Sequence, residues 1–484
     1  MTVRNQTNLY APIGEFSQTV GDILVEDSVF DDNLATGAFT EGGLVVNGVS
    51  GASIRIADST FRRNTAAGDG GALHFTSMSV PTIDIVGSVF EENAAGGGGG
   101  AVLAYTSSNS VTIRNSVFRD NGARSGGAIE HSQSGTMTVS GSTFEDNSAR
   151  SDGGAIFANS AQLTVSASTF QANAATAYAG AIWAGSAVVD ISASQFVGNS
   201  ADSAGGVYAW GGTTTTISTS TFRANTFGMA GGGILSDGSL TGSISIDSST
   251  FSGHAYSGGG TPRGAAIGLN SIAAPGSFTL LNSTVDESLT TGSAFSVASI
   301  AGGFAIRNST LRGASFVTGA VTNTTAVFEN SILEALDPAD DPVSTTVGAG
   351  GAFEISHSIL SGALPAAATD GGGNLEGTAP QLGALADNGG PTQTRVPQPG
   401  SPAIDAGAPA FTAPPAFDQR GTGFARVTFG RLDIGAVEVQ AQLLPATGGV
   451  VSWWLLPVAG GVLLLGIGGL VLARRARGAR HSAR

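Results

Sequence analysis

The residues whose types and order could take part in covalent chemistry lie at the C-terminal end of the chain. Residues 444–448 are Leu-Pro-Ala-Thr-Gly, and an apolar stretch follows over residues 450–473. As a helix rising about 1.5 Å per residue, this stretch would be roughly 36 Å long, which is enough to cross a bilayer. Five arginines within residues 474–484 close the chain, and a basic end of this kind stays in the cytoplasm. The order predicts a transmembrane helix over 450–473 and a cytoplasmic tail over 474–484.

This order of motif, apolar span and basic tail resembles the cell-wall sorting signal of Gram-positive surface proteins. The resemblance implies that a sortase, which is a membrane transpeptidase, recognises Leu444, Pro445, Ala446, Thr447 and Gly448. Its Cys thiolate would attack the Thr447 carbonyl and break the bond to Gly448. An amine of the peptidoglycan precursor would then resolve the acyl-enzyme, leaving the chain linked to peptidoglycan at the cell surface. The alternative is an ordinary membrane anchor with a chance LPATG sequence.

The rest of the chain offers little material for catalysis. It has no Cys and no Lys, and its five His are isolated from one another. Disulfide scaffolds, thiol nucleophiles and Cys-based zinc sites are therefore excluded. Acidic pairs such as Asp31/Asp32, Glu91/Glu92 and Glu145/Asp146 are expected to be solvated, and a weak calcium ladder is the alternative. We expect no enzyme, no metal and no cofactor.

The charge of the chain excludes a nucleic-acid partner. Residues 1–473 hold 16 Arg against 36 acidic residues, a formal charge of −20. Such a body repels nucleic-acid backbones and anionic lipid. Charged residues are only 12% and hydrophobic residues 41% of the chain, which argues for a packed core rather than disorder. The absence of Lys beside abundant Ala, Gly and Arg favours a GC-rich genome, hence an actinobacterium.

One phrase recurs along the first half of the chain: Ser, a small or β-branched residue, Phe, two variable residues, then Asn. Eight copies end in Asn, and a ninth, over 249–254, ends in His254. Successive Phe residues lie 26 to 31 residues apart. Weaker copies begin near residues 282, 308, 330 and 357. The repeat therefore has about thirteen units.

A second phrase, two Gly followed by a small and an aliphatic residue, lies about ten residues after each Phe. It occurs at 70–73, 99–102, 126–129 and 153–156, with variants at 179–182 and 205–208. Alternating β-branched and polar residues before each Ser are typical of a half-buried strand. Each unit of about 26 residues thus predicts three short strands and no helix. The fold expected is all-β, a right-handed single-stranded parallel β-helix of about thirteen coils spaced roughly 4.8 Å apart.

The repeated Phe and Asn residues are expected to be structural. The Phe rings should point inward and stack from coil to coil, each burial stabilising by roughly 1.5–3 kcal/mol. The Asn residues should turn a corner in the left-handed conformation and hydrogen-bond to the coils above and below. These predicted ladders comprise Phe61, Phe90, Phe118, Phe144, Phe170, Phe196 and Phe222, and Asn64, Asn93, Asn121, Asn147, Asn173, Asn199 and Asn225.

The two phrases together resemble the paired motifs of the chlamydial polymorphic outer-membrane proteins and, more broadly, the right-handed β-helix proteins with the pectate-lyase-like fold. The resemblance covers about residues 20–360. It implies an adhesin rod whose partner is an extracellular ligand such as a polysaccharide or a host surface. The alternative is a surface-attached polysaccharide lyase or hydrolase. The sequence lacks the Lys and the Gly-His-Gly expected for those reactions.

Residues 387–407, 418–421 and 431–438 resemble the choice-of-anchor Q module found at the C-terminal ends of bacterial surface β-helix proteins. The resemblance implies a cap over 366–440, because the open end of a β-helix exposes unpaired strand edges. The candidate salt-bridge or capping residues are Asp405, Asp418, Arg420, Asp433 and Glu438.

The expected organisation begins with a lead-in over 1–20 and a parallel β-helix over 21–365. The cap over 366–440, a linker with the sorting motif over 441–449, the membrane span and the tail follow. Residues 1–20 hold no apolar signal-peptide core after a basic start, and the repeat is already running by Asp22. We therefore expect the natural precursor to begin upstream with a signal peptide.

Overall fold

The computed structural model describes residues 1–440, apart from 9–10, 18–20, 38–42, 49–52, 77–81, 106–109, 161, 187, 211, 290–291, 314–315, 338–339 and 412–414. The predicted sorting linker (441–449), membrane span (450–473) and tail (474–484) lie outside the described residues. No segment of the described chain forms a helix of the length and hydropathy that a membrane crossing needs.

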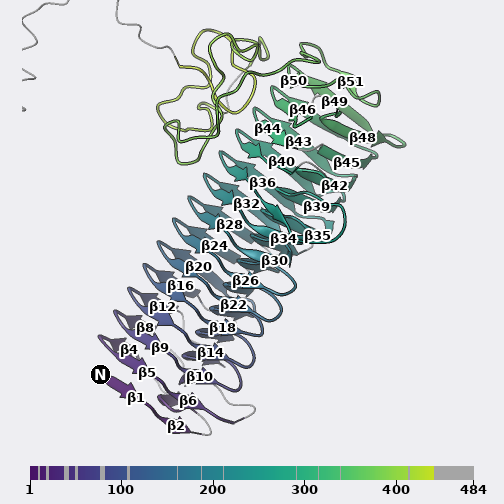
Figure 1. The fold of residues 1–484 in the computed structure, drawn as a ribbon. Coiled ribbons are helices and arrows are strands. Elements are labelled where there is room, and N and C mark those ends of the chain that lie inside the picture. Colours follow the sequence, from purple (N-terminus) through teal and green to yellow (C-terminus); the bar gives the residue numbers. More distant parts are fainter. Residues whose placement is uncertain are drawn as a thin grey trace, which may run out of the picture. The chain divides into compact units, whose positions relative to one another are not determined.

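The described chain is an all-β parallel solenoid of about 12 turns (Figure 1). It passes in order through four parallel sheets, which we name A to D. Every strand hydrogen-bonds to the equivalent strands of the neighbouring turns. The number of turns is close to the thirteen that the repeat predicts.

Sheets A and B follow each other in every turn in which both occur. Sheet A contains β1 (Thr2–Arg4), β5 (Val29–Asp31), β9 (Thr60–Arg62), β13 (Val89–Glu91), β17 (Val117–Arg119), β21 (Thr143–Glu145), β25 (Thr169–Gln171), β29 (Gln195–Val197), β33 (Thr221–Arg223), β37 (Thr250–Ser252), β41 (Thr284–Asp286), β44 (Thr310–Gly313), β47 (Ile332–Ala335) and β50 (Ile359–Leu360). Sheet B contains β2 (Thr7–Asn8), β6 (Leu34–Ala35), β10 (Thr65–Ala66), β14 (Ala94–Ala95), β18 (Gly122–Ala123), β22 (Ser148–Ala149), β26 (Ala174–Ala175), β30 (Ser200–Ser203), β34 (Thr226–Ala230) and β38 (Ala255–Tyr256).

Sheets C and D complete the turn. Sheet C contains β3 (Gly14–Ser17), β7 (Leu44–Asn47), β11 (Leu73–Thr76), β15 (Val102–Tyr105), β19 (Ile129–Ser132), β23 (Ile156–Asn159), β27 (Ile182–Ala184), β31 (Val207–Trp210), β35 (Ile234–Leu240), β39 (Ile267–Ile272), β42 (Phe295–Ile300), β45 (Phe316–Val321) and β48 (Val343–Val347). Sheet D contains β4 (Ile23–Glu26), β8 (Ser53–Ala57), β12 (Thr82–Val86), β16 (Ser110–Arg114), β20 (Thr136–Ser140), β24 (Gln162–Ser166), β28 (Val188–Ser192), β32 (Thr214–Ser218), β36 (Ser243–Asp247), β40 (Ser277–Leu281), β43 (Gly303–Arg307), β46 (Thr325–Glu329), β49 (Ala352–Ser356) and β51 (Thr369–Asp370).

Two expectations about the turn are corrected. Residues 1–20 are not a lead-in, because β1, β2 and β3 already pair with the second turn. Up to β38 a turn holds four strands rather than three. Most strands of sheet B are only two residues long, which is too short to produce an alternating pattern in the sequence.

The Phe residues of the repeat form one continuous stack inside the solenoid. From Phe30 to Phe251, neighbouring ring centroids are 4.6–4.9 Å apart and the rings are nearly parallel. The rings from Phe61 onward are fully buried. Face-to-face stacking follows from the coil spacing, because each Phe is in register with the Phe of the next turn.

The Asn residues form a buried hydrogen-bonded ladder beside the rings. In a typical rung, the backbone N and Nδ2 of Asn121 both donate to Oδ1 of Asn147, at 3.1 and 2.9 Å. Nδ2 also donates to the carbonyl of Phe90. The expected left-handed conformation belongs instead to the residue just before each Asn, such as Asp120 and Asp146, with φ of 55° and 52°. The Asn is therefore a hydrogen-bonding residue, and the preceding residue turns the corner.

The Gly pair has two different roles. Gly126 has φ of 59°, a conformation that side chains disfavour. A Cβ on Gly127 would lie 2.1 Å from the carbonyl oxygen of Gly154 in the next turn, so backbone proximity requires glycine there. A second ladder, which the sequence analysis did not assign, links Ser residues: the backbone N of Ser116 donates to Oγ of Ser142 at 3.2 Å.

The predicted cap has two parts with different positions. Residues 364–378 cover the end of the core, where Leu364 and Ala368 pack against it and β51 pairs with β49. Residues 380–440 lie instead against the outer face of sheet A. Nε2 of Gln419 donates to Thr250 at 2.9 Å.

Further hydrogen bonds fix this second part on the side of the solenoid. Thr284 donates to Oε1 of Gln419 at 2.5 Å, and the backbone N of Ala436 donates to Thr310 at 3.0 Å. Both threonines are buried, whereas Thr143 and Thr169, at the same position in earlier turns, are partly exposed. The expectation of a cap over the open end is thus corrected for residues 380–440.

The Phe stack generates a prediction about stability. Phe144→Ala should lower the free energy of unfolding by about 3–5 kcal/mol, because the ring is fully buried between two others and leaves a cavity. The measurement is the midpoint of urea unfolding. Phe429→Ala is the control, since Phe429 is 59% exposed and should change the midpoint little. Equal midpoints for the two variants would contradict the inward stack.

Candidate functional site

The outer face of sheet C holds the largest group of aromatic side chains outside the described core. In β23, Ile156 and Ala158 point into the core, so Phe157 between them points outward. The register places Trp183, Tyr208 and Leu235 at this outward position in the next three turns.

These outward side chains and their neighbours form an aromatic cluster, which consists of Phe157, Tyr178, Trp183, Tyr208 and Trp210. The Phe157 and Trp183 rings are stacked, with centroids 4.2 Å apart. Tyr208 is fully buried beneath its neighbours, whereas Tyr178 and Trp210 are 37% and 53% exposed. The centroids of those two rings lie 4.9 and 6.1 Å from that of Tyr208. The cluster is thus a fixed base that presents two aromatic rings to solvent.

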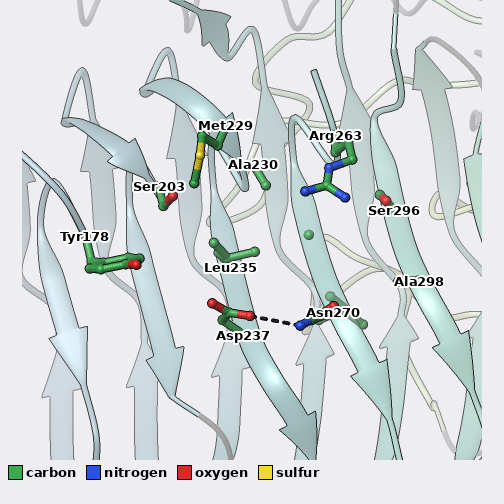
Figure 2. A pocket seen from close by; sticks show the side chains of 12 residues that line it. Tyr178, Ser203, Met229, Ala230, Leu235, Asp237, Arg263, Asn270, Ser296 and Ala298 are labelled. Atoms are coloured by element: carbon green, nitrogen blue, oxygen red, sulfur yellow. Dashed lines mark hydrogen bonds between the residues drawn. The ribbon is translucent and has the colours of Figure 1, made fainter. Parts of the chain in front are cut away.

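A hollow of about 140 Å³, open to solvent, lies beside the cluster (Figure 2). Four residues of the hollow occupy the same register position in four successive turns and so form one row across the strands. They are Tyr178, Ser203, Ala230 and Arg263. Its two large residues stand at the ends, three coil spacings or roughly 14 Å apart, with small residues between them. In the next column Gly268 follows Leu235, and the missing side chain deepens the hollow.

The polar groups of the hollow are held in place by Asp237. Its carboxylate accepts hydrogen bonds from the Tyr208 hydroxyl at 3.2 Å and from Nδ2 of Asn270 at 3.0 Å; Figure 2 shows the bond to Asn270. The backbone N of Gly238 donates to it at 2.7 Å. Burial, and then the nearby Asp237 charge, raise the pKa of Tyr208, so its hydroxyl stays a donor. Because its amide NH₂ is engaged, Asn270 can offer its carbonyl oxygen to a ligand.

Arg263 supplies the only positive charge among the residues that line the hollow. Within the described part of the chain its side chain has no ion pair and no hydrogen bond. Figure 2 places its guanidinium on the side of the hollow opposite Tyr178. Most other arginines of the body are engaged, for example Arg119 with Glu91 at 2.5 Å. Arg124 and Arg223 are also without a side-chain partner among the described residues. Arg263 is therefore available to an anionic ligand group.

Glu130 occupies the same outward column, one turn before Phe157. Burial raises its pKa to about 7, and the nearby Asp69 charge contributes in the same direction. The carboxyl of Glu130 accepts a hydrogen bond from Ser132 at 3.0 Å. This side chain is poised between its neutral and charged forms near neutral pH.

The residues singled out from the sequence lie elsewhere. The Phe and Asn ladders are inside the solenoid, out of reach of a ligand, and Leu444, Pro445, Ala446, Thr447 and Gly448 lie outside the described residues. Of the acidic pairs after the Phe residues, Asp31, Asp32 and Glu91 are paired with arginines. Glu92, Glu145 and Asp146 have no ion pair among the described residues. Asp31 is paired with Arg62 and Arg63 at 2.9 and 2.5 Å, and the hydrogen bond from Arg62 lowers its pKa. No group of three or more His, Asp or Glu able to hold a metal occurs in the described residues.

The candidate residues of the C-terminal module form one network, in which Asp418, Arg420, Asp433 and Glu438 are buried and Asp405 is exposed. Asp418 and Arg420 are paired at 2.6 Å. The backbone N of Asp405 donates to Asp433, and the backbone N of Asp433 donates to Glu438. Burial raises the pKa of Glu438 to about 7. These residues hold the module's own loops together.

The aromatic cluster is not among the sites predicted from the sequence, although the sequence carries a signal for it. The residue directly after the aliphatic of the Gly-Gly phrase is Phe157, Trp183 and Tyr208 in three successive turns. Taken as 205–208, the phrase has Tyr208 in the aliphatic place. The structure puts Val207 in register with Ile182, so Tyr208 points outward.

Comparison with known proteins supports the fold. Residues 13–170 match the family model for the right handed beta helix region. That match agrees with the right-handed winding expected from the sequence. A search of curated proteins finds no match to the chain.

The raised pKa of Glu130 predicts a pH-dependent change in stability. A carboxyl whose folded pKa of about 7 exceeds its ordinary 4.5 favours the folded state below pH ~4.5, and this contribution is lost as the pH rises through ~7. At pH 8, the free energy of unfolding of Glu130→Gln should therefore be about 1–3 kcal/mol higher than that of the wild type. At pH 5 the two proteins should have nearly equal free energies of unfolding.

Urea unfolding at the two pH values measures this effect. Glu15→Gln, at an exposed position, is the matched control. Its free energy of unfolding should differ from that of the wild type by the same small amount at pH 5 and at pH 8. If Glu130→Gln and the wild type unfold at the same urea concentration at pH 8, the buried carboxyl is not destabilising.

Proposed function

We propose that the protein is a rod of the bacterial cell surface that binds a carbohydrate through the aromatic cluster and the adjoining hollow. The observation that supports this best is that the exposed Tyr178 ring lines one open depression together with the fixed polar groups of Asp237 and Asn270. The exposed Trp210 ring lies outside the lining, on the strand next to Asp237. A sugar has apolar C–H faces that pack on aromatic rings and hydroxyls that need donors and acceptors. Both kinds of surface lie side by side here.

The rigid base under the two exposed rings favours binding. Tyr208 is held by Asp237 at 3.2 Å and by stacking with its neighbours, and Trp183 is held against Phe157. Side chains already fixed in the free protein lose little conformational entropy when a ligand arrives. A weak ligand such as a neutral sugar chain benefits most from this preorganisation.

For anchoring, we propose covalent linkage to peptidoglycan by a sortase, at the bond between Thr447 and Gly448. The support is the order of LPATG, an apolar stretch over 450–473 and a basic end. The precursor would span the membrane with its C-terminus in the cytoplasm, and the body would stand outside the cell. The acidic body, at −20, suits an extracellular rod with no affinity for nucleic acid.

A second candidate function is a polysaccharide hydrolase or lyase of the same fold. The specific observation in its favour is Glu130, whose pKa of about 7 suits a general acid. Release of reducing or unsaturated ends from polysaccharides by the wild type, lost in Glu130→Gln, would favour this candidate over the binding rod.

The binding proposal predicts the effect of removing the exposed rings. Purified full-length protein should bind members of a glycan array, and Trp210→Ala or Tyr178→Ala should weaken that binding about tenfold, since each loses one aromatic contact worth about 1.4 kcal/mol. Tyr105→Ala is the control, because Tyr105 is 50% exposed on the same sheet but outside the cluster. If glycan binding survives in both cluster variants, the proposed site is wrong. If the wild type binds no glycan, the proposed carbohydrate-binding function is wrong.

The anchoring proposal predicts where the protein is found in cells. Expressed behind a signal peptide in a Gram-positive host that has a sortase, the full chain should be linked to the wall and released only by a muramidase. Thr447→Ala should stay in the membrane fraction, because the acyl-enzyme cannot form at an unrecognised motif. Ala446→Ser, at the variable position, should behave as the wild type. Unchanged wall linkage of Thr447→Ala would refute the sorting signal.

A further inference from the structure

A column of three Asn side chains lies at the corner between sheets D and A, where the C-terminal module packs against the solenoid. Asn282, Asn308 and Asn330 directly follow β40, β43 and β46, and the pairing of these strands places them in register in successive turns. All three have the left-handed conformation, with φ of 46–49°. The three amides therefore occupy equivalent positions, one coil spacing of about 4.8 Å apart.

The two outer members of this column hydrogen-bond to the backbone of the module. Nδ2 of Asn282 donates to the carbonyl of Phe417 at 3.0 Å. Oδ1 of Asn330 accepts a hydrogen bond from the backbone N of Ala408 at 2.7 Å. One amide thus binds a backbone carbonyl and the other a backbone N–H, which are the two hydrogen bonds that an Asn side chain can make with a peptide.

Asn308, between these two, has no such partner. Its side chain makes no hydrogen bond within the described chain, and its Oδ1 is shielded from water. The residue is only 2% exposed. A buried polar group that stays unpaired costs about 1–3 kcal/mol. The middle position of the column therefore calls for a ligand that the other two positions already have.

A hollow of about 580 Å³ lies at Asn308, between the corner and the module. This volume is within the usual range of ligand sites. The module contributes apolar side chains to the lining, which are Pro409, Phe411 and Pro415, and the corner contributes Leu281. The hollow thus combines an apolar wall with one unengaged amide.

We propose that this hollow binds an extended peptide segment of a partner protein, and that Asn308 hydrogen-bonds to its backbone. In an extended chain the N–H and C=O of one residue point to the same side. Oδ1 of Asn308 accepts from that N–H, and Nδ2 donates to that carbonyl. Asn308 thereby makes with the partner both of the hydrogen bonds that Asn282 and Asn330 make separately with the module. The apolar side chains of the peptide pack against the proline and phenylalanine wall.

The charges around the hollow disfavour an acidic peptide. Arg307 and Glu329 both belong to the lining and are paired with each other at 3.1 Å, so neither offers a free charge to the ligand. The body as a whole carries −20 and repels negative groups. The partner segment is therefore apolar and either uncharged or basic. This site is separate from the hollow on sheet C, so the inference does not depend on carbohydrate binding.

The test selects peptides from a phage-displayed library of random sequences on purified full-length protein. Synthetic copies of the selected peptides should bind Asn308→Ala about ten- to a hundredfold more weakly than the wild type, because two hydrogen bonds are lost. Titration calorimetry measures both affinities. Alanine fits this corner, since Ala167 and Ala193 occupy it in earlier turns with φ of 47°.

Asn115→Ala is the matched control. Asn115 follows β16 at the same corner with φ of 50°, and it is exposed and outside the lining. This variant should bind the peptides as tightly as the wild type. Equal affinities of the wild type and Asn308→Ala, or an equal loss in both variants, would show that Asn308 does not hold the peptide.

A second measurement tests the backbone contact on the wild type itself. The peptide is N-methylated at one residue at a time, which removes one backbone donor in each copy. Methylation at one residue should weaken binding to the wild type about tenfold and leave the affinity for Asn308→Ala unchanged, because the bond is already missing there. If no residue shows this dependence, the ligand is not recognised through its backbone and the proposal is wrong.

Two further outcomes decide between occupants. If the library gives no binding peptide, the partner segment is wrong. If light scattering shows that the wild type dimerises and Asn308→Ala does not, the occupant is a second copy of this chain rather than another protein.

Discussion

The structure depends on one constraint: each turn of the chain hydrogen-bonds to the next through parallel strands about 4.8 Å apart. Equivalent residues in successive turns must therefore stack directly on each other. A residue type that fits this spacing is favoured in every turn. Phe rings at 4.6–4.9 Å, Asn amides and Ser hydroxyls all satisfy it. Stacking thus converts a sequence repeat into continuous columns of identical side chains.

The same constraint makes every departure from the repeat a local feature of the surface or core. The Asn ladder ends at Asn225, because His254 takes the next position and pairs with Glu287 at 2.5 Å instead. In the same region sheet B ends at β38, and the register shifts between β30 and β34 and between β35 and β39. The hollow is lined from these strands. Strands in regular register would give an even surface at this place. The register shifts and the missing side chain of Gly268 create the depression instead.

The sequence was sufficient for those features that repeat. The spacing of Phe and the alternating stretches predict a parallel β-helix, because both are consequences of stacking that recur in every turn. The position of residues 380–440 was not predictable, since single contacts such as Gln419 with Thr250 leave no pattern. The left-handed corner was assigned to Asn rather than to the residue before it, because Asp, Ala and Arg all occupy that position. The turn conformation is imposed by neighbouring coils, not by the side chain.

The candidate site was the hardest to predict because it breaks the repeat. Its residues come from one position in several turns, and Tyr178, Asp237 and Arg263 share no motif. Only the three aromatic residues after the Gly-Gly phrase leave a local signal, and their outward direction depends on a register that the variant at 205–208 obscures.

The outer faces of sheets A and D differ from that of sheet C in what they leave available to a ligand. The C-terminal module buries the outer face of sheet A over its last turns, and on sheet D Asp84 is paired with Arg114 at 2.8 Å. On sheet C, by contrast, Trp210 remains 53% exposed. Arg263, which comes just before β39, has no side-chain partner among the described residues. Exposed rings and unpaired charges gain little in water, whereas both become favourable contacts once a ligand of matching shape and charge excludes solvent. The asymmetry between the faces therefore favours sheet C as the face that binds.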